Sequence, residues 1–137
     1  MTKKETIITK LESGRAEFAL VCAREACSKN KQIQKEYRSY ARRIPQMILS
    51  NGLGQTLAFV FSKKKEGNAY YLVYEQMNKY MSSPHVSVIQ KPNDKDLAEW
   101  VFSLNTHEYR YVEEEILAFL NWLRRFAEGL IIEEGEE

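Results

Sequence analysis

The stretch EYRYVEEEILAFLNWLRRFAEGL, residues 108–130, carries the clearest structural signal in the sequence. Its apolar residues recur three and four positions apart, which is the spacing that one face of an α-helix requires. A helix of this length spans about 30 Å. The residues that share the predicted apolar face are Val112, Ile116, Phe119, Leu120, Leu123, Phe126, Ala127 and Leu130.

The same helical spacing recurs upstream of this stretch, and it predicts five further helices. They are expected at about residues 5–28, 31–44, 45–64, 70–81 and 94–104. Pro45 is predicted to end the second helix and to start the third. Residues 82–93 form the one long connector. The fold class is therefore all-α, a compact bundle of about six helices in a single domain.

Particular residues define the ends and buried faces of these helices. Thr2 and Glu5 form a capping-box pattern at the first helix, and Asp94 is the expected N-cap of the fifth. In the first helix the residues expected on the buried side are Ile8, Leu11, Phe18, Val21 and Cys22. In the third helix they are Leu49, Leu53, Leu57, Val60 and Phe61.

Length and composition set the class of protein. The chain has 137 residues, of which 44% are hydrophobic and 28% are charged, as in an ordinary globular domain. We expect a helical domain over residues 1–132 and an acidic tail over residues 133–137. No apolar run is long enough to span a bilayer, and no signal-peptide pattern is present, so a cytoplasmic protein with no membrane partner is predicted.

The net charge of +1 hides a strong asymmetry along the chain. Residues 1–65 contain 14 Lys and Arg against 5 Asp and Glu, whereas the rest contains 6 against 14, which gives +9 and −8. Such a division is typical of a basic surface that meets nucleic acid or an acidic partner. The alternative is that solvated faces happen to segregate by sign.

The second predicted helix concentrates basic residues on one side. On a helical wheel Lys31, Lys35, Arg38 and Arg42 fall together, opposite the apolar residues Ile33, Tyr37, Tyr40 and Ile44. Aligned cations repel one another and are not needed for folding, so this stripe favours contact with the phosphates of a polyanion. Arg43 adjoins the stripe and is included in the predicted site. An ordinary solvated helix face is the alternative.

A narrow polar line, Asn51, Gln55 and Ser62, follows an otherwise apolar helix. Buried amides need hydrogen-bond partners, so the favoured interpretation is an internal polar network that fixes the register of the helices. The alternative is a contact with a ligand or a partner.

Enzyme motifs and ligand patterns are absent from the sequence. There is no His-Glu-x-x-His, no Gly-x-Ser-x-Gly and no Cys-x-x-Cys, and His85 and His107 stand alone. Cys22 and Cys27 are expected to be reduced core thiols. The run Glu113–Glu115 is expected in the first turn of its helix, where acids suit the helix dipole. We therefore predict no catalytic residue, no metal and no cofactor.

The segment from Tyr40 to Phe59, YARRIPQMILSNGLGQTLAF, with Ser62-Lys63 after it, resembles the small subunit of the Cmr complex, the type III-B CRISPR effector. Its string Asn-Gly-Leu-x-Gln-Thr-Leu-Ala-Phe is the specific part. A second match lies near the C-terminus, where Tyr109-Arg110, Glu114, Leu117, Phe119-Leu120 and the stretch WLRRFAE, residues 122–128, look like the closing helix of that family.

The resemblance implies a compact helical bundle with no catalytic role. Small subunits of that family stack along the filament of backbone subunits and help to hold guide RNA and target RNA. The expected partners are these RNAs, other Cmr subunits and neighbouring copies of the chain. The resemblance also makes Asn51, Gln55, Arg124 and Arg125 candidates for RNA or neighbour contacts. The rival hypothesis is a helical protein–protein adaptor with no direct nucleic-acid contact.

Overall fold

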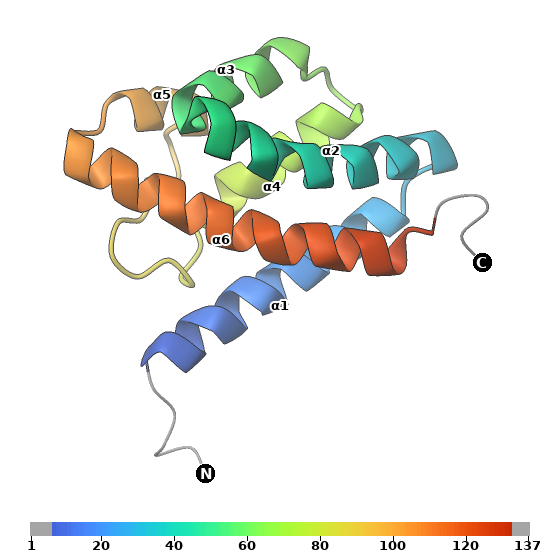
Figure 1. The fold of residues 1–137 in the computed structure, drawn as a ribbon, viewed down its shortest axis with the longest axis horizontal. Helices are drawn as coiled ribbons and strands as arrows, with labels where there is room; N and C mark the ends of the chain where they lie inside the picture. The colour runs from blue at the N-terminus through green and yellow to red at the C-terminus, as the bar shows by residue number, and fades with distance from the viewer. Residues whose placement is uncertain (1–6, 133–137) are drawn as a thin grey trace.

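Helices form nearly all of the regular structure of the chain. The computed structural model describes residues 7–132, and within that range it contains six helices and no strand (Figure 1). They are α1 Ile7–Cys27, α2 Lys31–Asn51, α3 Leu53–Lys63, α4 Ala69–Met81, α5 Leu97–Phe102 and α6 Thr106–Leu130. The predicted all-α bundle in one domain is confirmed. The predicted capping box at Thr2 and Glu5 and the acidic tail lie outside the described residues.

The longest helix, α6, contains the amphipathic stretch of residues 108–130, and it packs against both α1 and α2. In Figure 1, α2 runs antiparallel beside α6, α1 crosses α6 on its other side, and α4 lies behind them. A capping box formed by Asn105 and Glu108 starts α6. Leu130, predicted to be buried, is 42% exposed because it is the last residue of the helix. The predicted face residues that are buried are Val112, Ile116, Phe119, Leu120, Leu123 and Ala127.

Pro45 does not separate two helices, so that prediction is wrong. α2 continues through Pro45, which is buried, and ends only at Asn51. A proline inside a helix removes one backbone hydrogen bond and costs about 3 kcal/mol, and burial of this face of α2 offsets the cost. The break falls at Gly52, whose φ of 88° lies in the region that favours glycine.

The position of the helix break decides which apolar residues of this region are buried. Leu53, Leu57 and Val60 are fully buried, as predicted, but Leu49 is 76% exposed and Phe61 is 49% exposed. A single helix over residues 45–64 would bring Leu49 close to the face of Leu53. Because the chain instead forms two helices with different axes, Leu49 belongs to the solvent face of α2 and Phe61 to the edge of the α3 face.

Small residues form the buried face of α1. They are Ala19, Cys22, Ala23 and Ala26. Val21, predicted to be buried, lies on the opposite side of the helix and is 62% exposed. The connector after α4 also approaches α1 closely, since a Cβ atom at Gly14 would lie 2.8 Å from Nδ1 of His85. Small residues on α1 therefore allow close packing both against the neighbouring helices and against the connector between α4 and α5.

The connector between α4 and α5 is held by its own polar contacts. Val86 is buried, and the Nζ atom of Lys91 donates to the carbonyl oxygens of Pro92 and Lys95. The hydroxyl of Tyr74 donates to the carboxylate of Asp96 and accepts a hydrogen bond from the backbone N–H of Ala98. The N-cap of α5 is consequently Asp96 rather than Asp94.

A buried ion pair joins α1 and α6. The Nε and Nη2 atoms of Arg15 each donate to one carboxylate oxygen of Glu115 at 2.9 Å, and the hydroxyl of Tyr80 on α4 donates to the same carboxylate. Glu115 is one of the three acids expected in the first turn of this helix. That prediction is wrong, because α6 begins at Thr106 and places Glu115 well inside it, on the buried side.

The surroundings of Glu115 keep it ionised. Burial by itself would raise the pKa of Glu115, but the hydrogen bonds from Arg15 and Tyr80 outweigh burial and hold the pKa below its ordinary value. The hydrogen bond to Glu115 raises the pKa of Arg15. Three helices thus depend on one charged cluster for their mutual position.

Replacing Arg15 with methionine should lower the free energy of unfolding by about 3 kcal/mol at pH 7, because it leaves a buried carboxylate without its cation. The pKa of Glu115 is depressed in the folded protein, so the pair stabilises the fold above the ordinary glutamate pKa, and this contribution falls as pH drops through the folded pKa. Urea denaturation should therefore show a smaller effect of Arg15→Met at pH 3 than at pH 7.

The matched control is Arg24→Met, an exposed arginine on the same helix. It should change the free energy of unfolding by less than about 0.5 kcal/mol at either pH. Equal losses in the two variants, or a loss in Arg15→Met that does not depend on pH, would contradict the role assigned to this cluster.

Candidate nucleic-acid interface

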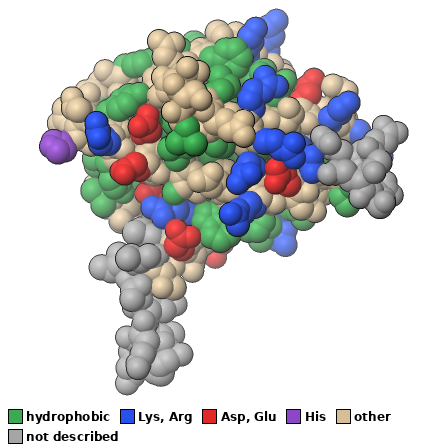
Figure 2. Space-filling model, viewed as in Figure 1, with side chains coloured by type: hydrophobic (Ala, Val, Ile, Leu, Met, Phe, Trp, Pro, Cys, Tyr) green, Lys and Arg blue, Asp and Glu red, His purple; other side chains and the backbone are tan. Residues whose placement is uncertain are grey.

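The helix α2 presents four of its cations to solvent. Lys31, Lys35, Arg42 and Arg43 are all exposed, and the helix that carries them is capped by Asn30, whose side chain accepts a hydrogen bond from the backbone N–H of Ile33. On the face shown in Figure 2, Lys and Arg side chains gather where α2 begins and α6 ends, with acidic side chains among them. Most of the predicted basic stripe is therefore available to a partner.

Arg38 is the exception, and its predicted place on the exposed stripe is wrong. Its exposed fraction is only 5%. The prediction took the centre of the buried face from apolar residues between Ile33 and Ile44. However, α2 extends beyond Ile44, and Ala41, Pro45 and Ile48 are also buried. These residues rotate the centre of the buried face by about 70° on the helical wheel, toward Arg38.

Arg42 is exposed but already has an acidic partner. Its Nε atom donates to Oε2 of Glu128 on α6 at 2.9 Å, with side-chain exposures of 52% and 28%. The pair links α2 to α6 and neutralises one charge of the stripe. A partly exposed pair of this kind contributes about 0–1 kcal/mol to stability, so a phosphate can compete with Glu128 for Arg42.

Lys31, Lys35 and Arg43 remain without a carboxylate partner among the residues that the structure describes. The guanidinium of Arg43 lies over the ring of Tyr40, 5.5 Å from its centroid, and stays exposed. These three residues are the available cations of α2.

The two predicted arginines of α6 differ in exposure. Arg125 is exposed, whereas Arg124 is half-buried. Arg124 precedes Glu128 by four residues and therefore shares its side of α6, which faces Arg42 of α2. The structure thus leaves Arg124 half-buried, on the side of α6 that carries Glu128, and Arg125 exposed to solvent.

Asn51 and Gln55 lie on the surface, on either side of the break at Gly52. Ser62 is also exposed, and its hydroxyl donates to the carbonyl oxygen of Phe59. The predicted internal polar network is therefore wrong at all three positions. The alternative, in which these amides contact a ligand or a partner, agrees with their exposure.

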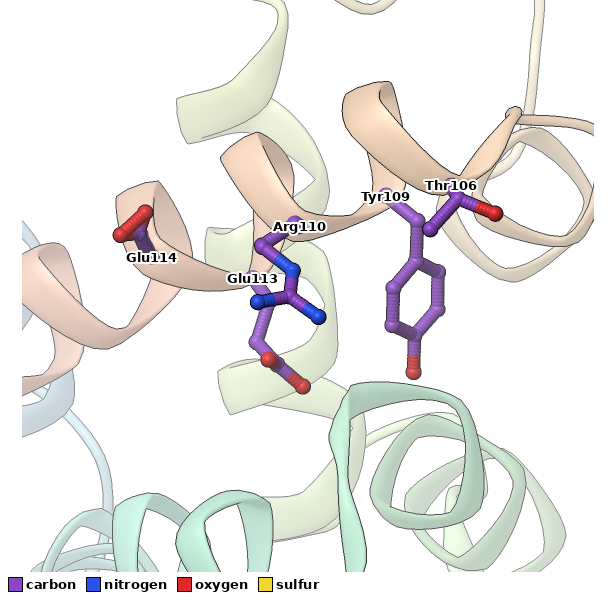
Figure 3. A pocket seen from close by; sticks show the side chains of 5 residues that line it. All are labelled: Thr106, Tyr109, Arg110, Glu113 and Glu114. Carbon is purple, nitrogen blue, oxygen red and sulfur yellow. The ribbon is translucent and has the colours of Figure 1, made fainter.

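The residues that support the start of α3 were missed by sequence reasoning. The backbone N–H of Leu53 donates to Oε2 of Glu113 at 2.9 Å, and that of Gly54 donates to the hydroxyl of Tyr109 at 2.7 Å. In Figure 3 the side chains of Tyr109 and Glu113 point from α6 toward the start of α3. These contacts join residues 55 and 60 positions apart, and no local pattern signals them.

These two side chains also line a shallow pocket together with Thr106, Arg110 and Glu114 (Figure 3). The tight fit explains Gly54, where an added Cβ atom would lie 3.2 Å from Phe102 and 3.3 Å from the hydroxyl of Tyr109. Because Glu113 and Tyr109 already bind the N-terminus of α3, these two side chains support the turn that lies between Asn51 and Gln55.

The structure offers no cluster for metal chemistry within residues 7–132: no three His, Cys, Asp or Glu side chains there could hold an ion together. Burial raises the pKa of the Cys22 thiol to about 12, so Cys22 is a packed thiol rather than a nucleophile. None of the helices that the structure describes is long and apolar enough to cross a membrane.

Similarity to known proteins extends over most of the chain. The family described as CRISPR-associated protein (Cas_Cmr5) matches residues 11–130. The CRISPR system Cmr subunit Cmr5 of Thermus thermophilus is 32% identical over 98 residues, which are 72% of this chain and 77% of that protein. An X-ray structure of a CRISPR-associated Cmr5 family protein from the same organism gives a TM-score of 0.73 at 28% identity and covers 89% of this chain and 97% of the other.

Replacing Glu113 with alanine should lower the free energy of unfolding by about 1 kcal/mol, because it removes a side-chain cap from the first turn of α3. Thermal denaturation checks this, and Glu114→Ala, an exposed neighbour on the same helix, is the matched control. A loss of the same size in both variants would show that the hydrogen bond to Leu53 contributes nothing specific.

Proposed function

The chain belongs to the CRISPR-associated Cmr5 family, and from that membership we propose that it is a small, non-catalytic subunit of a type III-B Cmr ribonucleoprotein that helps to hold guide and target RNA in antiviral defence. Its partners in this role are the RNA and other Cmr subunits. The observation that carries the RNA contact is the set of available cations on α2, Lys31, Lys35 and Arg43.

These cations have no evident role in folding. Like charges on one helix repel one another, and the three side chains are exposed rather than packed in the core. Binding to a polyanion makes these charges favourable, since each phosphate contact releases condensed counterions. Phosphate contacts position a strand without reading its sequence. Such contacts suit a subunit that holds any guide and its target.

The proposal assigns no catalytic residue to this chain. Glu115 is the buried carboxylate of the described residues, and it is bound by Arg15 and Tyr80. Cys22 is buried with a raised pKa. Both groups are therefore occupied in packing, and the exposed groups of the candidate interface are cations and amides that bind rather than react.

Exposed apolar side chains favour a second candidate, an adaptor that contacts only protein. Leu49, Phe61 and Phe102 are each about half or more exposed. Apolar residues at the surface are common in monomers, so each alone carries little weight. The two candidates differ in one measurable property: an adaptor that meets only protein has no salt-dependent affinity for RNA.

Reversing the available cations, Lys31→Glu, Lys35→Glu and Arg43→Glu together, should weaken binding to a labelled oligouridine with little loss of stability. Three phosphate contacts to a single strand account for a slope of about −2 in log affinity against log salt concentration. This slope corresponds to a roughly twenty-fold loss of affinity between about 50 and 200 mM salt. Fluorescence anisotropy titrations at several salt concentrations should show that the triple variant loses this share of the slope.

The matched control reverses three exposed cations elsewhere: Lys79→Glu, Lys95→Glu and Arg110→Glu. It changes the net charge by the same amount, so it separates a local contact from a general effect of charge. Equal weakening in the two triple variants, or no salt-dependent RNA binding by the unmodified chain, would count against the proposed interface and favour the adaptor.

We further propose that copies of the chain stack head to tail along the complex, with the basic surface of one copy against an acidic surface of the next. The charge division along the sequence supports such a heterologous contact. Part of that charge is used within the chain, however, because Arg15 pairs with Glu115 and Arg42 with Glu128. The remaining exposed pairs between copies are weak and screened by salt.

The isolated chain should therefore sediment mainly as a monomer at about 0.15 M salt and should stack only on an assembled complex. Analytical ultracentrifugation at low and high salt tests the first expectation, and native mass spectrometry of the complex gives the copy number. A closed dimer that persists at high salt, or a single copy in each complex, would contradict stacking.

A further inference from the structure

Three aromatic side chains from three different helices meet at the surface beside the available cations. The rings of Tyr40 on α2 and Tyr70 on α4 stack with centroids 3.8 Å apart and planes 13° apart. Phe59 on α3 meets Tyr70 edge to face at 5.9 Å. All three side chains are only partly buried. Stacked rings that stay open to solvent provide a flat apolar platform at a polar surface.

A hollow lies directly beside the stacked tyrosines. Its walls include Tyr40 and Tyr70 together with Glu36, Ser62, Lys63 and Lys65. The space available in it is about 480 Å³, which is within the range of about 300–1,000 Å³ that small-ligand sites occupy. The hollow therefore has room for one nucleotide unit.

Cations surround the rings on two sides. The Arg43 guanidinium lies 5.5 Å from the Tyr40 centroid, and the Nζ atom of Lys63 lies 5.8 Å from the centroid of Phe59. Neither these side chains nor Lys65 has a carboxylate partner among the residues that the structure describes. Positive charge and open π-faces thus occur together, which is the combination that single-stranded nucleic acids require.

The Tyr40 ring stays partly open to solvent, and Arg43 is the cation that lies over it. The Arg43 guanidinium is 5.5 Å from the ring centroid, considerably farther than the 3.8 Å that separates the centroids of the two tyrosine rings. Arg43 is exposed and can turn toward a phosphate or offer its own plane for stacking. Glu36 and Tyr40 are one helical turn apart on α2 and share a side with Arg43.

We propose that this surface, formed by Tyr40, Tyr70, Arg43, Lys63 and Lys65, binds one unpaired nucleotide of an RNA strand. The base extends the stack at its Tyr40 end, and Lys63 and Lys65 contact the adjacent phosphate. The Glu36 carboxylate, which accepts a hydrogen bond from Gln32, lies where it can also accept one from an exocyclic amino group of the base. This inference rests on the proposed function and adds base stacking to it.

The site predicts a preference that phosphate contacts alone do not produce. A stacked base requires an unpaired strand, so duplex RNA should bind more weakly than a single strand of the same length. Because stacking is tolerant of sequence, the four bases should bind similarly, apart from an advantage for bases that carry an amino group. Lys31 and Lys35, on the neighbouring side of α2, would hold the phosphates on one side of this nucleotide.

The unmodified chain can be tested first, without any variant. An oligouridine that contains 2-aminopurine should lose fluorescence when it binds, because the inserted base stacks on an aromatic ring. An RNA of equal length with abasic positions throughout should bind about five-fold or more weakly, since stacking on a protein ring typically contributes at least this factor. Equal affinity of the abasic strand, or unchanged 2-aminopurine fluorescence in the bound state, would overturn the inference.

Substitution of Tyr40 locates the effect on this surface. Tyr40→Leu should weaken binding of the single strand by about five- to hundred-fold without changing its salt slope, whereas Tyr40→Phe should retain the affinity. Lys63→Gln with Lys65→Gln should instead reduce the slope by about 0.7, because the two lysines contact one phosphate. Phe61→Leu, which removes an exposed ring elsewhere on α3, is the matched control and should have no effect.

The outcomes separate this inference from the proposed function. If RNA binding depends on salt but Tyr40→Leu and Phe61→Leu bind RNA with equal affinity, the proposed phosphate contact stands and the stacking site is rejected. An absence of RNA binding by the unmodified chain would reject both. A third outcome is that the unmodified chain captures a purified Cmr subunit, that Tyr40→Leu fails to capture it, and that both bind RNA with the same affinity. This result would identify the surface as a protein contact and would also overturn the inference.

Discussion

Glu115 holds the bundle together, because its buried carboxylate accepts hydrogen bonds from Arg15 of α1 and Tyr80 of α4 while its own helix packs against α1. A buried charge is tolerated only when its surroundings supply charge and hydrogen bonds of this kind. The same helix, α6, reaches the remaining long helices through other polar side chains. Glu113 and Tyr109 bind the N-terminus of α3, and Glu128 pairs with Arg42 of α2.

This use of α6 gives the charge division of the sequence a partly structural meaning. The acidic second part of the chain supplies carboxylates that meet cations or backbone N–H groups of the basic first part. The cations that remain after this internal pairing are therefore informative. Among the described residues they include Lys31, Lys35 and Arg43 on α2, Lys63 at the end of α3 and Lys65 after it, and they are the cations that we propose contact a phosphate backbone.

The break at Gly52 has the largest effect on the surface of the molecule. If α2 ended at Pro45, Asn51 and Gln55 would lie on one continuous helix, and Leu49 would share its buried face. Because the chain turns at a glycine with positive φ, both amides face solvent at the end of α2 and the start of α3. Gly52, together with Glu113 and Tyr109 of α6, therefore places Asn51 and Gln55 at the surface rather than in the core. Both amides thus belong to the candidate interface.

The sequence by itself determined the fold class, the length and apolar face of α6, the position of α4, and the region in which cations gather. These features depend on contacts between residues three and four positions apart, and the period of a helix records such contacts directly. Only the tertiary structure decided that Arg38 is buried, that Glu115 is paired with a residue 100 positions away, and that Tyr40 stacks on Tyr70. The axial rotation of a helix and the partner of a buried charge depend on which helices pack against it, and the period of the sequence contains no information on that choice.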